Sequence, residues 1–107
     1  MDNRLFFPAT LRNRDCIGDV ISRFITINGS ILEIGSGSGE HGVFFQKRFP
    51  EIKWQTSDPD KIHRKSINSW IEYERLNKKM PQPLEIDVSK VPWEIPLDLV
   101  NSLIGII

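Results

Sequence analysis

Residues 31–39 read Ile31-Leu32-Glu33-Ile34-Gly35-Ser36-Gly37-Ser38-Gly39, a short and mostly apolar run followed by three alternating glycines. Such an apolar run is typical of a strand that is buried on both faces. The glycines let the backbone turn sharply and come close to a ligand, because no side chain stands in the way. A helix after the loop would present free N–H groups and the positive end of its dipole to an anionic group. The stretch therefore predicts a strand, a ligand-binding loop and a helix, in that order.

Upstream of this stretch the pattern predicts a helix. Asp15 can cap it, and Ile17, Val20, Ile21 and Phe24 follow the spacing of one buried helical face. The Asn28-Gly29 pair then ends the helix as a turn.

Downstream, strands and helices are expected in alternation. A helix is predicted over 40–49, ended by Pro50, and a strand over 52–58 from alternating apolar and polar residues. Asp58 and Pro59 predict the cap and first residue of a helix that runs to about residue 77 and buries Ile67, Trp70 and Ile71. Further strands are predicted over 84–88 and 98–107.

Alternating strands and helices imply a parallel sheet with helices on both faces, an α/β, Rossmann-like fold. The 107 residues fit a single domain. Ligands of such sheets bind at the carboxyl ends of the strands. The glycine loop, Asp58 and Asp87 each follow a predicted strand, so we expect them to converge on one crevice.

Composition excludes several classes of partner. Lys plus Arg number 14, as do Asp plus Glu, so the formal charge is zero and gives no strong nucleic-acid or membrane signal. Cys16 is the only cysteine, which excludes an internal disulfide and favours a reducing, cytoplasmic location. His41 and His63 have the spacing of neither a metal pair nor a catalytic triad, so no metal site is predicted. The apolar segments at either end are too short for a signal peptide or a membrane span.

The glycine spacing alone leaves a dinucleotide as an alternative ligand. Gly37, Gly39 and Gly42 satisfy the G-x-G-x-x-G spacing of dinucleotide-binding proteins. That fingerprint should begin where the strand ends, at Gly35, and this register puts Glu40 in place of the third glycine. Glu33 would also repel a pyrophosphate and would favour a sulfonium or ammonium group. An NAD-binding oxidoreductase module is therefore the less favoured interpretation.

Residues 31–39 resemble motif I of class I S-adenosylmethionine-dependent methyltransferases. Within that superfamily, three stretches resemble the methyltransferase-like domain-of-unknown-function 938 family: Arg12-Asn13-Arg14-Asp15, Glu40-His41 after the glycine loop, and Trp54-Gln55-Thr56-Ser57-Asp58-Pro59-Asp60. The resemblance implies that S-adenosylmethionine is the cofactor. It implies that the methionine part of the cofactor lies over the three loop glycines, Gly35, Gly37 and Gly39.

The same resemblance implies four further contacts. Glu33 would help to hold the cofactor's amino group, and Asp58 would accept hydrogen bonds from the ribose hydroxyls. Asp87 would face the adenine amino group, with the backbone of Val88 beside it. These roles are carried over by analogy.

Family members continue beyond the fourth strand, whereas this chain ends at Ile107, so a truncated class I methyltransferase fold is expected. The strand predicted over 98–107 would then be an exposed apolar edge, through which a homo-oligomer could form. The leading hypothesis is a methyltransferase-like protein that acts mainly by aligning the methyl group with an unidentified acceptor. No general base can be named. The alternative is a non-catalytic or degenerate cofactor-binding fragment.

Overall fold

A parallel sheet of three strands forms the centre of the computed structural model, which describes residues 2–25 and 27–107. The strand order is β2-β1-β3, with β1 in the middle and hydrogen-bonded on both sides. The strands are β1 (Gly29–Leu32), β2 (Ile52–Gln55) and β3 (Leu103–Ile106). Parallel pairing requires a crossover between consecutive strands, and the helices of the chain supply it.

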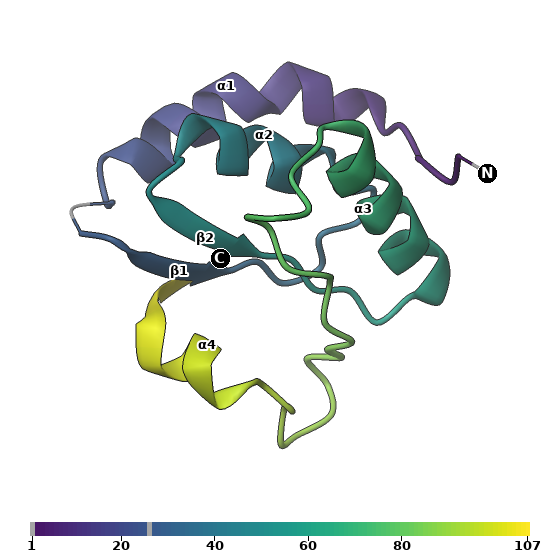
Figure 1. Ribbon diagram of the computed structural model, residues 1–107. Helices are drawn as coiled ribbons and strands as arrows, with labels where there is room; N and C mark the ends of the chain where they lie inside the picture. Colours follow the sequence, from purple (N-terminus) through teal and green to yellow (C-terminus); the bar gives the residue numbers. More distant parts are fainter. Residues whose placement is uncertain (1, 26) are drawn as a thin grey trace.

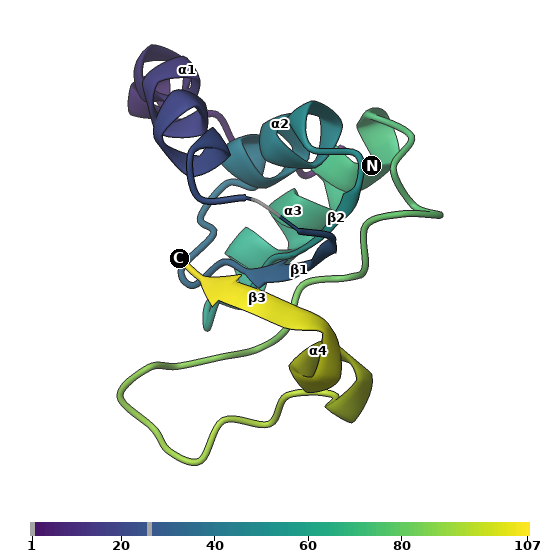
Figure 2. The same ribbon diagram turned by 90° about the vertical axis from the view of Figure 1, so that its left-hand side faces the viewer.

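Helices cover both faces of this sheet. Three of them lie on one side: α1 (Pro8–Ser22), α2 (Glu40–Arg48) and α3 (Lys61–Tyr73). The short α4 (Leu97–Ser102) lies on the other, as Figure 2 shows with β3 and α4 in yellow. Successive side chains of β1 point to opposite faces of the sheet. Ile31 packs in the core beneath α1–α3, and Leu32 packs with Leu99 of α4. The predicted α/β fold with helices on both faces is confirmed.

The prediction of a strand over 84–88 is wrong, because this stretch forms only one β-bridge. Leu84 pairs with Ser57 in parallel, beyond the end of β2, and the chain then leaves the sheet. Along β2 itself the outer edge is occupied by Gln46, whose Oε1 accepts the Trp54 N–H (2.8 Å) and whose Nε2 donates to the Ile52 carbonyl (2.6 Å). One side chain of α2 thus provides the hydrogen bonds that a neighbouring strand would otherwise make.

Two helix starts differ from the prediction. α1 begins at Pro8, not after Asp15, because Phe7 is extended and proline is favoured in a first helical turn. Ile21 is buried as expected, but Val20 and Phe24 are exposed. α3 is capped by Asp60, whose carboxylate accepts the Ile62 N–H at 2.7 Å, and not by Asp58.

Two element ends also differ. α3 stops at Tyr73 rather than near residue 77, because Arg75 adopts a positive φ of 59° that a helix cannot continue. The stretch predicted as a strand over 98–107 starts instead with α4, whose Ser102 hydroxyl donates to the Asp98 carbonyl one turn before (3.0 Å). Only Leu103–Ile106 is a strand.

β3 lies at the edge of the sheet, as the sequence predicted for the last strand. Ile106 and Ile107 are about half exposed there. Association of two copies through this edge stays a prediction. Within the described residues, no helix is long and apolar enough to cross a membrane, and no cluster of histidine, cysteine and acidic residues could hold a metal ion.

Candidate cofactor site

The glycine loop lies between β1 and α2, and its three glycines all have positive φ. The angles are 62° at Gly35, 61° at Gly37 and 97° at Gly39, in a region that residues with a side chain rarely adopt. Gly39 is also the N-cap of α2. The sequence prediction of a sharp, glycine-dependent turn after β1 is therefore confirmed.

The surroundings of the three glycines differ. A Cβ added at Gly35 would have no atom within 4 Å and would point into open space. At Gly37 it would lie 3.3 Å from the Phe7 ring, and at Gly39 it would lie 2.8 Å from the Cα of Ile67 in α3. Gly39 is thus required for packing, whereas Gly35 leaves a space beside the loop in which a ligand can sit.

Two serines join the ends of β1 and β2 beneath this loop. The Ser36 N–H donates to the Ser57 carbonyl (2.8 Å), and the Ser57 N–H donates to the Ser36 hydroxyl (3.0 Å). The Ser57 hydroxyl donates to the carbonyl of Glu33 at 2.7 Å. These bonds hold the carboxyl ends of β1 and β2 together. Parallel α/β proteins bind their ligands at this end of the strands.

Asp58 connects the loop to the start of α3. Its Oδ2 accepts the Gly37 N–H at 2.9 Å, and its Oδ1 accepts the Asp60 N–H at 2.9 Å. The Nδ1 of His63 lies 3.2 Å from the same Oδ1. A carboxylate offers about four lone-pair sites, so three neighbours leave Oδ2 with capacity for another donor. Asp58 thus lies beside the glycine loop, as the sequence predicted.

Glu33 is buried under the loop. Its Oε1 accepts hydrogen bonds from the Ser36 hydroxyl (2.8 Å) and from the Trp54 indole N–H (3.2 Å), and its exposed fraction is 8%. Burial is the largest influence on this carboxyl and raises its pKa, against the two hydrogen bonds, which lower it. Asp58 adds a smaller contribution in the raising direction.

This raised pKa predicts how Glu33 affects stability. The folded state holds the proton of Glu33 more tightly than the unfolded state, so stability falls as pH rises from the ordinary value of 4.5 through the raised value. We expect Glu33→Gln, which can keep both accepted bonds, to raise the urea midpoint at neutral pH and to change it little below pH 4.5.

Glu40→Gln is the matched control for that measurement. Glu40 is also buried, but it lies in the first turn of α2, where the helix dipole favours a negative charge. Its amide variant should therefore gain no stability at neutral pH. A Glu33→Gln variant that is less stable than the wild type at neutral pH would contradict this account.

Asp87 and Val88 lie after the Leu84 bridge, in a turn. Asp87 Oδ1 accepts both the Ser89 N–H (3.0 Å) and the Ser89 hydroxyl (2.6 Å), and these bonds lower its pKa. Val88 is exposed. Among the described residues, no hydrogen bond or ion pair joins Asp87 to the glycine loop or to Asp58. Hydrogen bonds do join the loop to Glu33 and to Asp58. The roles of Asp87 and Val88 stay predictions.

Sequence reasoning missed Ser36 and Ser57, which build the loop, and His63 and Phe7, which flank it. The rings of Phe7 and His63 meet edge to face with centroids 6.0 Å apart. The only sequence signal for His63 is its position one turn into the helix after Asp58. Phe7 has none, since it contacts the loop from a distant part of the chain.

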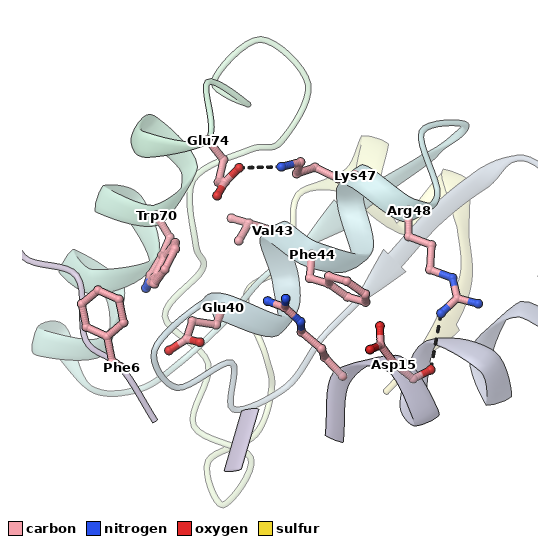
Figure 3. A pocket seen from close by; sticks show the side chains of 10 residues that line it. Phe6, Asp15, Glu40, Val43, Phe44, Lys47, Arg48, Trp70 and Glu74 are labelled. Atoms are coloured by element: carbon pink, nitrogen blue, oxygen red, sulfur yellow. Dashed lines mark hydrogen bonds and ion pairs between the residues drawn. The ribbon is translucent and has the colours of Figure 1, made fainter. Parts of the chain in front are cut away.

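One groove of the molecule does not have Gly35 among its lining residues. It has a volume of about 740 Å³ and runs between α1, α2 and α3, as Figure 3 shows. The Lys47–Glu74 ion pair (2.7 Å) bridges it at one side, and Glu40 is part of its lining. Phe6 and Trp70 form its aromatic wall.

Comparison with known proteins identifies the family. The model of the family described as "Protein of unknown function (DUF938)" matches residues 4–106. This chain belongs to the DUF938 family. The resemblance read from the glycine loop and from the stretch around Asp58 is therefore confirmed.

Three solved structures illustrate what this DUF938 chain is similar to. A proposed S-adenosyl-L-methionine-dependent methyltransferase from Methanococcus maripaludis has 23% identity and a TM-score of 0.66, over 81% of this chain and 39% of its own. Coclaurine N-methyltransferase, bound to N-methylheliamine and SAH, has 13% identity and a TM-score of 0.60, over 75% and 24%. YjhP from E. coli has 20% identity and a TM-score of 0.58, over 76% and 31%.

These likenesses show the Rossmann-like fold of class I methyltransferases. The DUF938 chain spans between 24% and 39% of the length of these proteins, so their activities are not transferred to it by the comparison.

Proposed function

We propose that this chain binds S-adenosylmethionine at the carboxyl ends of β1 and β2 and takes part in methyl transfer. The observation that carries the proposal is the pairing of Gly35, which is open on its Cβ side, with Asp58, whose carboxylate is bonded to the same loop at Gly37. A cofactor with a ribose can lie over Gly35, and its ribose hydroxyls can donate hydrogen bonds to the Asp58 carboxylate. The bound cofactor would supply a methyl group activated by a sulfonium.

The residues of this chain would bind and orient the cofactor. Asp58 accepts from the ribose hydroxyls through Oδ2, and the glycine loop lets the methionine part approach the backbone. Glu33, whose carboxyl group is buried beneath the loop, helps to hold the amino group of the cofactor. Asp87 accepts from the adenine amino group through Oδ2, because both Ser89 bonds go to Oδ1, and the Val88 backbone lies beside the ring.

Methyl transfer in this scheme depends on alignment rather than on proton transfer. Holding the sulfonium methyl in line with an acceptor converts an encounter between two molecules into a step within one complex. The acceptor is left open, as is the alternative that the chain binds the cofactor without transferring its methyl group.

A dinucleotide remains the competing ligand, and one feature of the structure bears on it. The first positive φ after β1 is at Gly35, so the loop starts there and the register Gly37, Gly39, Gly42 begins too late. Gly42 lies inside α2, where a Cβ would come within 2.8 Å of Thr56, which gives it a packing role in either case.

Calorimetric titration with S-adenosylmethionine and, separately, with NAD tests the proposal. We expect saturable binding of S-adenosylmethionine and weaker or no binding of NAD. Tighter binding of NAD than of S-adenosylmethionine, or no binding of S-adenosylmethionine by a folded chain, would refute the proposed cofactor. Accumulation of S-adenosylhomocysteine with candidate acceptors then separates methyl transfer from binding alone.

A further inference from the structure

The first residues of the chain are bonded to α3 and to the glycine loop. Residues 2–7, here called the N-terminal strap, run beside α3 before α1 begins (Figure 1). Three hydrogen bonds fix the strap to that helix: Asn3 N–H to the Ser69 hydroxyl (3.2 Å), Leu5 N–H to the Ser66 hydroxyl (2.8 Å), and the Trp70 indole N–H to the Leu5 carbonyl (3.0 Å). The Arg4 guanidinium also stacks 3.6 Å from the Tyr73 ring centroid.

Two hydrogen-bonded paths lead from the strap into the loop. In the first, Leu5 donates to Ser66, and the Ser66 hydroxyl donates to the Ser38 carbonyl at 2.6 Å. In the second, the Phe7 N–H donates to Glu40 Oε1 at 3.1 Å, at the point where the loop enters α2. Ser66 is fully buried and Glu40 nearly so, which makes both connections costly to break.

The Phe7 side chain completes the surroundings of the loop. It lies 3.3 Å from where a Gly37 Cβ would stand, and its ring meets that of His63, which is bonded to Asp58. Phe7 is 39% exposed, so part of the ring is free to contact a ligand. Phe7 and His63 therefore form an aromatic rim beside the Gly37–Asp58 hydrogen bond.

We infer that the N-terminal strap reaches the cofactor site through Phe7, its last residue: Phe7 packs against the cofactor next to Asp58, and Ser66 positions the loop by linking it to the strap. This inference rests on the proposed function for the cofactor contact. The coupling of strap to loop is a property of the ligand-free chain and can be measured without any cofactor.

Phe7→Ala and Phe6→Ala form a matched pair. Both remove one aromatic ring from the strap, but Phe6 packs edge to face on Trp70 (centroids 5.2 Å apart), on the side of the groove in Figure 3. We expect Phe7→Ala to weaken binding of S-adenosylhomocysteine about tenfold and Phe6→Ala to leave it within about twofold. Equal affinities of the two variants, or tighter binding by Phe7→Ala, would overturn the contact.

Ser66→Ala tests the positioning role. Ser66 is fully buried, so it can affect the cofactor only indirectly, through the loop and the strap that it links. We expect faster hydrogen exchange in residues 35–43 of the ligand-free variant, together with weaker binding, while Phe6→Ala leaves that exchange unchanged. Unchanged exchange in Ser66→Ala would overturn the coupling. If Ser66→Ala shows the coupling but the folded wild type binds no cofactor, the proposed function and the Phe7 contact are refuted, and the link between strap and loop stands.

Discussion

Gly39→Ala is expected to lower the free energy of unfolding by about 2–5 kcal/mol, the sum of a left-handed backbone strain and an overpacked contact. The new methyl would stand 2.8 Å from the Ile67 Cα, which is backbone and cannot turn aside as a flexible side chain could. The φ of 97° adds strain for any residue with a side chain. Urea denaturation of the two proteins measures the difference.

Gly35→Ala is the matched control in the same loop. Its φ of 62° carries a similar backbone strain, about 1–2 kcal/mol, but its methyl meets no atom within 4 Å. This variant should therefore stay folded and lose cofactor binding, since its methyl enters the space assigned to the ligand. Equal stabilities of the two variants would contradict the packing role of Gly39, and unchanged cofactor binding by Gly35→Ala would contradict the position assigned to the ligand.

Asp58→Ala is expected to weaken S-adenosylmethionine binding about 100-fold, the size of a hydrogen bond to a charged group lost from a buried site. It should also cost about 1–3 kcal/mol of stability, because the N–H groups of Gly37 and Asp60 would lose their acceptor. Calorimetry and urea denaturation measure the two effects separately.

Asp60→Ala controls for loss of a neighbouring carboxylate. Asp60 caps α3 and its side chain is half exposed, so its removal should cost about 1 kcal/mol of stability. The affinity for the cofactor should not change. If the two variants lose affinity equally, the effect comes from the start of α3 and not from a contact between Asp58 and the ribose.

The part of the site that the sequence predicts is local along the chain. The strand, the three glycines and the start of α2 follow one another within residues 29–48, so propensity and spacing are sufficient to place them. The position of Asp58 after a strand predicts it in the site, and its position before Pro59 also predicts it as a helix cap. Asp60, on the other side of Pro59, takes that role because the Asp58 carboxylate is bonded to Gly37.

Contacts between distant residues account for the rest. No pattern in the sequence indicates that the Gln46 side chain occupies the outer edge of β2, and this leaves residues 84–88 with a single bridge instead of a strand. The Phe7–Gly37 contact joins residues far apart in the chain, so the strap was not predicted as part of the site. Such pairings depend on tertiary packing, which single-sequence periodicity does not record.

Backbone amide NMR of the chain during titration with S-adenosylmethionine tests the central claim most directly. We expect saturable shifts concentrated at residues 35–39 and at Asp58, with smaller shifts at Phe7 and His63 beside them. Saturable shifts confined to another surface, such as the apolar groove between α1 and β3, would contradict the account, as would a folded chain whose spectrum does not change.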